Sequence, residues 1–179
     1  MHFPVAERAL AAGFHVMSDK PATLTLAEAL QLQAVLQDTG LLYGLTHTYT
    51  GYPLVKEARA RVAAGELGSI RKVVVEYPQG WLTEKLEDEG QKQAAWRSDP
   101  AKAGKAGAYG DIGTHAANMA EYVSGLQITK VLSQMSKVVE GRLLDDDSSA
   151  LLEFEGGVPG VLICSQVSAG EENALKVKV

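Results

Sequence analysis

The residues with the clearest chemical potential lie between Gly104 and Gly125. A loop with glycine at every third position leads there into a stretch with helical spacing. Asp111 and His115 are four residues apart in it, which places a carboxylate and an imidazole one turn apart on a helix. Histidine exchanges protons near neutral pH, and a carboxylate beside it can orient it. The pair is therefore suited to general acid–base chemistry at a hydroxyl or carbonyl carbon.

A lysine in the first half of the chain could complete this set. Lys20 follows Phe14–Met17, a short apolar segment that we expect to be a buried strand. Ligands of open α/β sheets bind at the carboxyl ends of strands, and a lysine there can stabilise a developing alkoxide. Taken singly, each of the three residues has an ordinary structural interpretation. Lys20 can be a solvated turn lysine, Asp111 a capping acid and His115 a hydrogen-bonded core histidine.

Two possible metal sites are alternatives to this interpretation. Asp111, His115 and His47 could supply three zinc ligands, but neither an HExxH pattern nor a cysteine pair accompanies them. The acidic run Asp145–Asp147 lacks the spacing of a calcium loop, so we expect it to be a solvated turn. We therefore expect no metal.

Two other features are assigned to structure. The glycines between residues 104 and 113 do not form GxGxxG and follow no strand, so they are not a dinucleotide fingerprint. Cys164 lies in an apolar run, which favours a buried structural thiol over a reactive one. No serine or cysteine nucleophile with its partners emerges.

The composition is that of an ordinary globular protein. The chain has 179 residues, of which 46% are hydrophobic and 22% charged, with a net charge of −5. The negative charge argues against a nucleic acid or an anionic membrane as partner. No apolar run approaches the roughly 18 residues that a membrane span needs, and the start lacks a signal-peptide pattern. We therefore expect a cytoplasmic protein.

The elements that must position these residues fall into two groups. The first alternates helix and strand, which predicts a parallel sheet flanked by helices. Its expected elements are a helix over 4–13, the strand at 14–17, a helix opened by the capping box at Thr25, a strand over 41–46 and a helix over 53–64. The second group begins with a strand over 69–78 and an aperiodic segment over 79–109.

The rest of the second group is mostly strand. A helix over 111–124 should pack through Ile112, Ala116, Met119, Ala120 and Val123. Strands are then expected over 128–139, 149–154, 158–167 and 173–179, with a hairpin connection at Glu155–Gly157. Consecutive strands predict a mostly antiparallel sheet and an α+β second half. The helix at the start and the strand at the end suggest a piece of a longer chain.

Three segments resemble the Gfo/Idh/MocA family, the relatives of glucose–fructose oxidoreductase and inositol dehydrogenase. Residues 11–21 resemble its AGKHVxxEKP segment, and residues 65–71 its GxLGxIR turn. Residues 96–100 followed by 110–115 resemble its WRxDP…DxGxH block. The resemblance implies a Rossmann-type remnant over 1–47 and an α+β substrate-binding domain over 48–179, with a mostly antiparallel sheet and flanking helices.

The resemblance also implies an activity. It predicts oxidation of a sugar or polyol hydroxyl by NAD or NADP, or the reverse reduction. Lys20, Asp111 and His115 would be the catalytic set, with His115 as proton acceptor. Asp19, Lys20 and Pro21 would lie beside the nicotinamide riboside.

The departures from the family pattern concern the pocket and the cofactor. Asp19 stands where the family usually has Glu, and residues 48–53 replace an arginine-containing stretch. The candidates for the substrate-binding walls are His47, Tyr49, Tyr52, Trp96 and Arg97, with Trp81 beside them. The family's GxGxxG loop is missing, so we expect the chain alone to be inactive. An alternative is a non-catalytic interaction module, and the family's habit of associating through its sheet implies a homodimer or homotetramer.

Overall fold

The computed structural model describes residues 2–179 and divides the chain into two compact units. The first unit ends at Thr48, and the second runs from Tyr49 to Val179. Each unit has its own hydrophobic core, and each is described by itself. Within residues 2–179 no helix has the length and apolar character that a membrane crossing requires.

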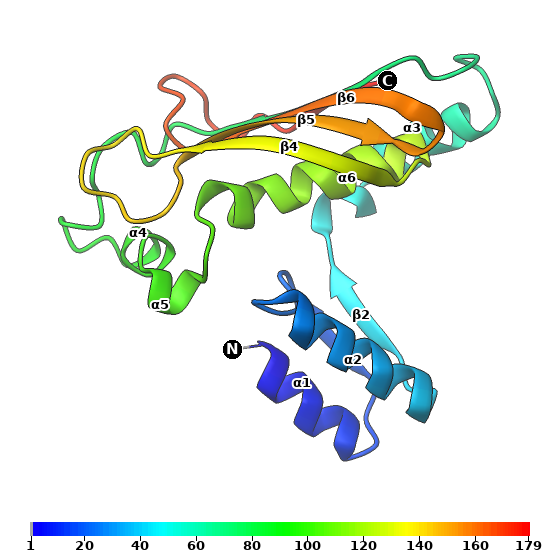
Figure 1. The fold of residues 1–179 in the computed structure, drawn as a ribbon, viewed down its shortest axis with the longest axis horizontal. Helices are drawn as coiled ribbons and strands as arrows, with labels where there is room; N and C mark the ends of the chain where they lie inside the picture. Colours follow the sequence, from blue (N-terminus) through cyan, green and yellow to red (C-terminus); the bar gives the residue numbers. More distant parts are fainter. Residues whose placement is uncertain (1) are drawn as a thin grey trace. The chain divides into compact units, whose positions relative to one another are not determined.

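The first unit is a helix–strand–helix–strand segment (Figure 1). Its elements are α1 (His2–Ala11), β1 (Val16–Asp19), α2 (Leu26–Thr39) and β2 (Tyr43–Thr46). The two strands pair in parallel, as the alternation predicted. The predicted capping box is present, because the Thr25 side chain accepts from the Glu28 backbone and the Glu28 carboxylate reaches back to the Thr25 N–H. Ala6, Leu10 and Leu32 form the buried core of this unit.

The expectation of a buried strand at Phe14–Met17 is wrong. The strand begins at Val16, and the side chains of Phe14 and Met17 are 66% and 81% exposed. Successive strand side chains point to opposite faces. Val16 packs against the cluster formed by α1 and α2, so Met17 projects from the other face of β1.

The second unit is built on a five-stranded mixed sheet (Figure 1). The strand order is β4-β5-β6-β3-β7, and among the described strands of this sheet only the β3–β6 pair is parallel, so the prediction of a mostly antiparallel sheet is confirmed. The strands are β3 (Val73–Pro78), β4 (Ile128–Ser136), β5 (Asp147–Phe154), β6 (Val158–Ser165) and β7 (Lys176–Lys178). The turn η3 (Glu155–Gly157) makes the predicted hairpin between β5 and β6.

Helices pack on one face of this sheet. α6 (Thr114–Ser124) lies against β3, with α3 (Pro53–Ala63) beside it and the short turn η1 (Thr48–Gly51) before α3. Val73, Val75 and Tyr77 of β3 point into this layer and are buried. The packing face predicted for the helix over 111–124 is confirmed, since its members are at most 5% exposed: Ile112, Ala116, Met119, Ala120 and Val123. Burying each large apolar side chain stabilises the fold by roughly 1.5–3 kcal/mol.

The segment between β3 and α6 is more ordered than its lack of periodicity indicated. It contains two short helices, α4 (Lys92–Arg97) and α5 (Pro100–Ala103), and a single wide π turn, η2 (Tyr109–Gly113). The helix predicted from residue 111 therefore starts as a π turn and becomes α-helical at Thr114. Such wide turns are rare and frequently occur at functional sites.

The glycines of this segment permit close packing. A Cβ atom on Gly107 would lie 2.1 Å from the Asp145 carbonyl oxygen, and one on Gly113 would lie 3.1 Å from the Cys164 sulfur. Neither glycine has a positive φ, so the requirement here is the close approach of the backbone and not an unusual backbone conformation. The glycine-repeat loop is thus a packed element.

The expected solvated turn at Asp145–Asp147 is also wrong. Asp145 and Asp146 are only 7% and 1% exposed, because both carboxylates accept hydrogen bonds from neighbouring backbone N–H groups. Arg142 is buried with them and pairs with Asp146 at 3.2 Å and with Glu87 at 2.9 Å. Acidic runs are usually solvated, so the local sequence does not predict the burial of these carboxylates.

The buried thiol generates a prediction about pH. Cys164 is fully buried, as expected, and burial raises the pKa of its thiol to about 12. In the unfolded chain the thiol ionises near pH 8.5. Below that pH it is protonated in both states, whereas above it only the unfolded chain releases the proton, so stability falls as pH rises.

We expect the free energy of unfolding of the wild type to decrease between pH 8 and pH 10 by more than that of Cys164→Ala. Urea titrations followed by tryptophan fluorescence measure both, since Trp81 and Trp96 lie in the second unit. A thiol reagent at pH 8 should label Cys164 only in urea. Rapid labelling of the folded protein would contradict the assignment.

Candidate active site

Asp111 is held by side chains from two other elements. Its Oδ2 atom accepts a hydrogen bond from Arg97 Nε at 3.0 Å and another from Gln166 Nε2 at 3.0 Å. Arg97 is the last residue of α4, and Gln166 follows β6 and is 2% exposed. The side chains of Arg97 and Asp111 are 25% and 20% exposed, so the pair is partly screened from water. Asp111 is thereby fixed in orientation on the π turn before α6.

The guanidinium of Arg97 also lies close to two aromatic rings. Its carbon is 4.3 Å from the centroid of the Trp96 ring and 5.9 Å from that of Trp81. Gln93, one turn earlier on α4, accepts a further hydrogen bond from Arg97. Cation–π contacts of this kind contribute about 0.5–2 kcal/mol each. Three of the predicted wall residues, Trp81, Trp96 and Arg97, therefore form one cluster next to Asp111.

His115 lies in a second, aromatic cluster. Its ring is 4.9 Å from the ring of Tyr49 and 6.4 Å from that of Tyr77, both edge to face. Tyr52 packs edge to face on Tyr49 at 6.1 Å. Tyr49 comes from η1, Tyr77 from β3 and His115 from the first turn of α6. Sequence reasoning proposed Tyr49 and Tyr52 but not Tyr77, whose place in an apolar strand predicted only core packing.

A chain of hydrogen bonds links the two clusters. The hydroxyls of Tyr49 and Tyr77 are 2.5 Å apart, and Tyr77 donates to Asn173 Oδ1 at 2.7 Å. Gln79 Nε2 donates to the same oxygen at 2.7 Å, and Trp81 Nε1 donates to Gln79 Oε1 at 3.1 Å. Burial, followed by the contact with Tyr49, raises the pKa of Tyr77, so this phenol stays protonated.

Two of these partners, Gln79 and Asn173, were missed by sequence reasoning, as was Gln166. Each lies outside any recognised motif, and Asn173 is 96 residues from the tyrosine that it binds. Only the pairing of β3 with β6 and β7 brings these residues together. No local signal in the sequence identifies them.

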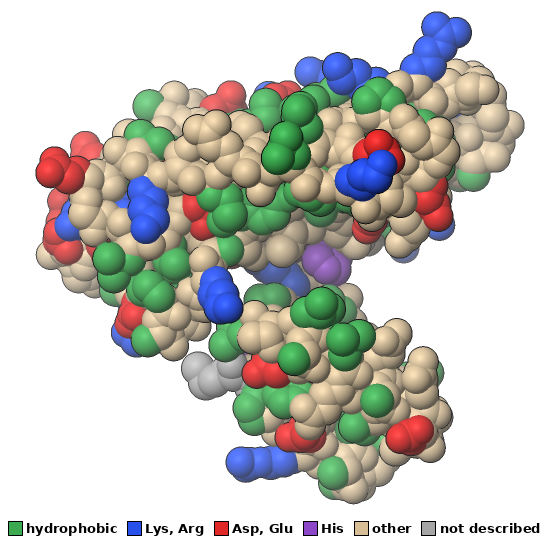
Figure 2. Space-filling model, in the orientation of Figure 1, with side chains coloured by type: hydrophobic (Ala, Val, Ile, Leu, Met, Phe, Trp, Pro, Cys, Tyr) green, Lys and Arg blue, Asp and Glu red, His purple; other side chains and the backbone are tan. Residues whose placement is uncertain are grey.

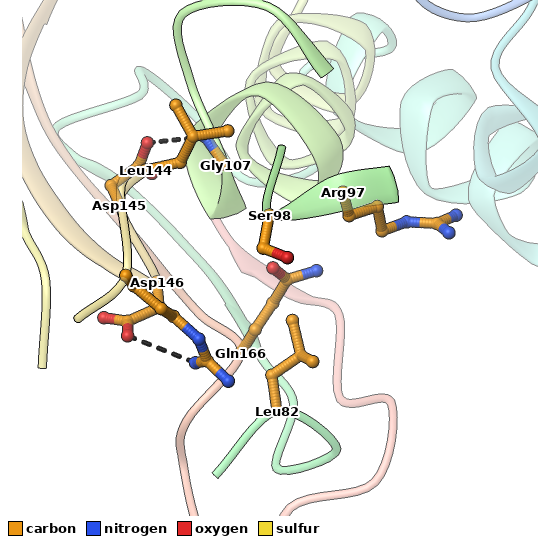
Figure 3. Close-up of a pocket in the computed structure, with 9 residues that line it drawn as sticks. Leu82, Arg97, Ser98, Gly107, Leu144, Asp145, Asp146 and Gln166 are labelled. Carbon is orange, nitrogen blue, oxygen red and sulfur yellow. Dashed lines mark hydrogen bonds and ion pairs between the residues drawn. The ribbon is translucent and has the colours of Figure 1, made fainter. Parts of the chain in front are cut away.

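The buried acidic segment positions both the π turn and Gln166 (Figure 3). The Asp145 carboxylate accepts from the backbone N–H groups of Gly107 at 2.6 Å and Tyr109 at 2.7 Å. The backbone N–H of Gln166 donates to the Asp146 carbonyl oxygen at 2.8 Å. A small cavity between these groups is lined by Leu82, Arg97, Ser98, Gly107, Arg142, Leu144, Asp145, Asp146 and Gln166.

The remaining predicted residues lie at one edge of the first unit. Asp19 and Thr46 are partners at the carboxyl ends of the parallel strands β1 and β2. Asp19 Oδ1 accepts from the Lys20 backbone N–H at 2.8 Å and from Thr46 Oγ1 at 3.1 Å. Although desolvation opposes the change, these hydrogen bonds and the charge of Lys20 lower the pKa of Asp19. The peptide bond from Lys20 to Pro21 is cis.

His47 follows Thr46 at the same edge. Burial, together with the positive charge of Lys20, lowers the pKa of His47, so this imidazole is neutral at pH 7. The first unit thus gathers Asp19, Lys20, Pro21 and His47, while the second gathers Asp111 and His115 with the aromatic walls. Asp111, fixed by Arg97 and Gln166, lies four residues before His115 in the chain. A carboxylate and an imidazole that face one ligand can orient a hydroxyl group and take its proton.

Comparison with known proteins identifies the class of this chain. Residues 55–179 match the model of the GFO/IDH/MocA C-terminal domain. Residues 1–47 match the model of an oxidoreductase family with an NAD-binding Rossmann fold. The chain therefore belongs to the GFO/IDH/MocA family of oxidoreductases.

Individual relatives cover the whole chain. The uncharacterised oxidoreductase YfiI of Bacillus subtilis is 31% identical over 99% of this chain and 46% of its own length. A crystal structure of an inositol dehydrogenase homologue from Azotobacter vinelandii with NAD+ matches with a TM-score of 0.92 and 36% identity, over 98% of this chain and 46% of that one. A complex of such a homologue with NADH and myo-inositol matches with a TM-score of 0.87 and 32% identity, over 98% and 44% of the two chains. The chain spans about half the length of the curated relatives that it matches.

We predict that Asp145→Asn destabilises the second unit. The carboxylate accepts three hydrogen bonds, from Gly107, Tyr109 and Ser148, whereas an amide offers one oxygen and would turn its NH2 group toward a donor. The expected loss is about 2 kcal/mol in the free energy of unfolding, measured by urea titration. Among the described residues Asp147 accepts no side-chain hydrogen bond, so Asp147→Asn is the matched control and should change little. Equal effects of the two variants would contradict the proposed anchor.

Proposed function

We propose that this protein is an NAD- or NADP-dependent oxidoreductase that acts on a sugar or polyol hydroxyl. The observation that carries the proposal is Asp111 on the π turn η2, fixed by Arg97 and Gln166, four residues before His115 in the first turn of α6. Family membership supports the same activity. So does the relative that was crystallised with NADH and myo-inositol.

In this proposal each residue has one task. His115 accepts the proton of the reacting hydroxyl, and Asp111 orients that hydroxyl and the imidazole. Lys20 stabilises the negative charge that develops on the oxygen. The nicotinamide ring, when bound, accepts the hydride from the carbon. That Lys20 and the Asp111–His115 pair face one ligand remains a prediction.

The cofactor would bind at the carboxyl ends of the strands in the first unit. Asp19, Lys20 and Pro21 follow the carboxyl end of a parallel strand, where nucleotide ligands of α/β sheets bind. The 179 residues contain no GxGxxG sequence to hold the pyrophosphate. We therefore propose that this stretch of chain alone binds the cofactor weakly and does not turn over.

The substrate would contact aromatic and polar walls. Tyr49 packs beside His115, and Tyr52 packs on Tyr49. Arg97 pairs with Asp111 and contacts Trp96. Aromatic faces and hydrogen-bonding groups together suit the apolar and hydroxyl-bearing sides of a sugar ring. His47, neutral at pH 7, is the candidate contact from the first unit.

The catalytic role of His115 is tested by its removal from the full-length gene product. His115→Ala should lower kcat for polyol oxidation by about 10²–10⁴-fold, because general-base catalysis is lost, while NADH binding by fluorescence is retained. His15→Gln, an exposed histidine of the first unit, is the control and should keep the wild-type rate. A His115→Ala enzyme with wild-type kcat would contradict the assignment.

A second candidate role is self-association through the sheet. On the face of β4, β5 and β6 opposite α6, Leu132, Leu151 and Ile163 are 72%, 60% and 37% exposed. Leu132 and Leu151 are register partners, so their side chains form one continuous apolar patch. Figure 2 shows hydrophobic side chains at the surface of the part of the molecule that holds this sheet. A second copy of the chain would cover such a patch.

We expect the protein to be a dimer or tetramer by light scattering. Leu132→Glu should shift it toward monomer, because an interface would bury the new charge. Leu143→Glu, at a residue that is 64% exposed but outside the patch, is the control and should leave the oligomer intact. A wild-type protein that is monomeric at high concentration would exclude this role.

A further inference from the structure

The hydrogen-bond chain beside His115 has a direction that is set at one end. The indole Nε1–H of Trp81 can donate a hydrogen bond but cannot accept one. Its partner, 3.1 Å away, must therefore be the carbonyl oxygen Oε1 of Gln79. This fixes the orientation of the Gln79 amide, and its NH2 group points at Asn173, 2.7 Å away.

The same logic determines the next two contacts. Because Gln79 donates, Asn173 presents its carbonyl oxygen, which also accepts from the Tyr77 hydroxyl at 2.7 Å. A phenol has a single proton, and Tyr77 uses it in this bond. The Tyr77 oxygen is therefore the acceptor in its 2.5 Å contact with Tyr49, and Tyr49 is the donor.

Burial keeps this order in place. Tyr77 is 1% exposed, so water does not replace its partners. Reversing the direction would leave the Trp81 N–H or the Gln79 NH2 group facing another donor. The Tyr49 hydroxyl, whose proton is committed to Tyr77, can offer a ligand only the lone pairs of its oxygen.

Tyr49 is also next to the proposed proton acceptor. Its ring lies 4.9 Å from the ring of His115, and the residue is half-buried. We infer that its hydroxyl is within reach of a ligand held at His115. A ligand group that meets this oxygen must donate a hydrogen bond. Hydroxyl groups can do so, whereas ether and carbonyl oxygens cannot.

We propose that Tyr49 determines specificity by accepting a hydrogen bond from a second hydroxyl of the substrate. The inference rests on the proposed function and narrows its substrate class to molecules with at least two free hydroxyl groups. Trp81, Gln79, Asn173 and Tyr77 act as positioning residues, because they hold the Tyr49 proton away from the ligand.

The enzymatic test uses the full-length gene product, NAD+ and a polyol with its mono-O-methyl ethers. The wild type should reject the ether at the recognised hydroxyl by at least about tenfold in kcat/KM, since two acceptors would face each other. Tyr49→Phe should remove this preference. Tyr77→Phe should reduce it, because the freed Tyr49 hydroxyl can rotate and donate to the ether oxygen.

Tyr122→Phe is the matched control and should keep the full preference, since its ring contact with Arg59 needs no hydroxyl. Tyr49→Phe or Tyr77→Phe with the wild-type preference would overturn the proposal. So would a wild type that accepts every mono-ether as well as the parent polyol.

Neutron crystallography of the deuterated protein tests the hydrogen-bond direction without any substrate. We expect the deuteron of Tyr49 between Tyr49 and Tyr77, and that of Tyr77 toward Asn173. A Tyr77 deuteron directed at Tyr49 would overturn the inference even in an active enzyme. An enzyme that oxidises no polyol would overturn the proposed function and the substrate assignment with it, while the deuteron positions would still decide the direction.

Discussion

One buried carboxylate holds the candidate site together. Asp145 is buried, and removing its charge from water costs free energy. Hydrogen bonds from backbone N–H groups of the loop that leads into α6 offset this desolvation cost. The loop can approach so closely because Gly107 has no side chain. The π turn begins from this anchor, and it sets the rotation at which Asp111 meets Arg97 and Gln166. The geometry of the acid–imidazole pair therefore depends on a contact outside the pair.

Local pattern predicted those elements whose burial follows a simple period. The apolar face of the α6 region, the capping box of α2 and the hairpin at Glu155–Gly157 were predicted from the sequence, because spacing and turn chemistry act over a few residues. The π turn, the burial of Asp145 and the partners of Tyr77 were not. They arise from hydrogen bonds between segments 28 to 96 residues apart, for which a single sequence holds no local signal.

The two units contribute different chemistry to the family fold. The first presents charged and polar groups where two parallel strands end, among them Asp19 and Lys20. The second presents the His115 imidazole on α6, which packs against the sheet, and the Asp111 carboxylate on the π turn before it, with aromatic rings beside His115 and Arg97. Family membership rests on both halves of the chain. The tyrosines beside His115, in a stretch that departs from the family pattern, are where substrate choice can diverge from that of relatives.

The position of β3 in the sheet has a consequence for how the protein is made. Both of its neighbours, β6 and β7, come from residues after 157, so neither exists while β3 leaves the ribosome. Until they are synthesised, the side chains of Val73, Val75 and Tyr77 have no sheet to join. Pairing over so long a separation slows folding and leaves an apolar edge exposed in the nascent chain. We therefore expect the yield of native protein to depend on translation speed and chaperone binding over this interval.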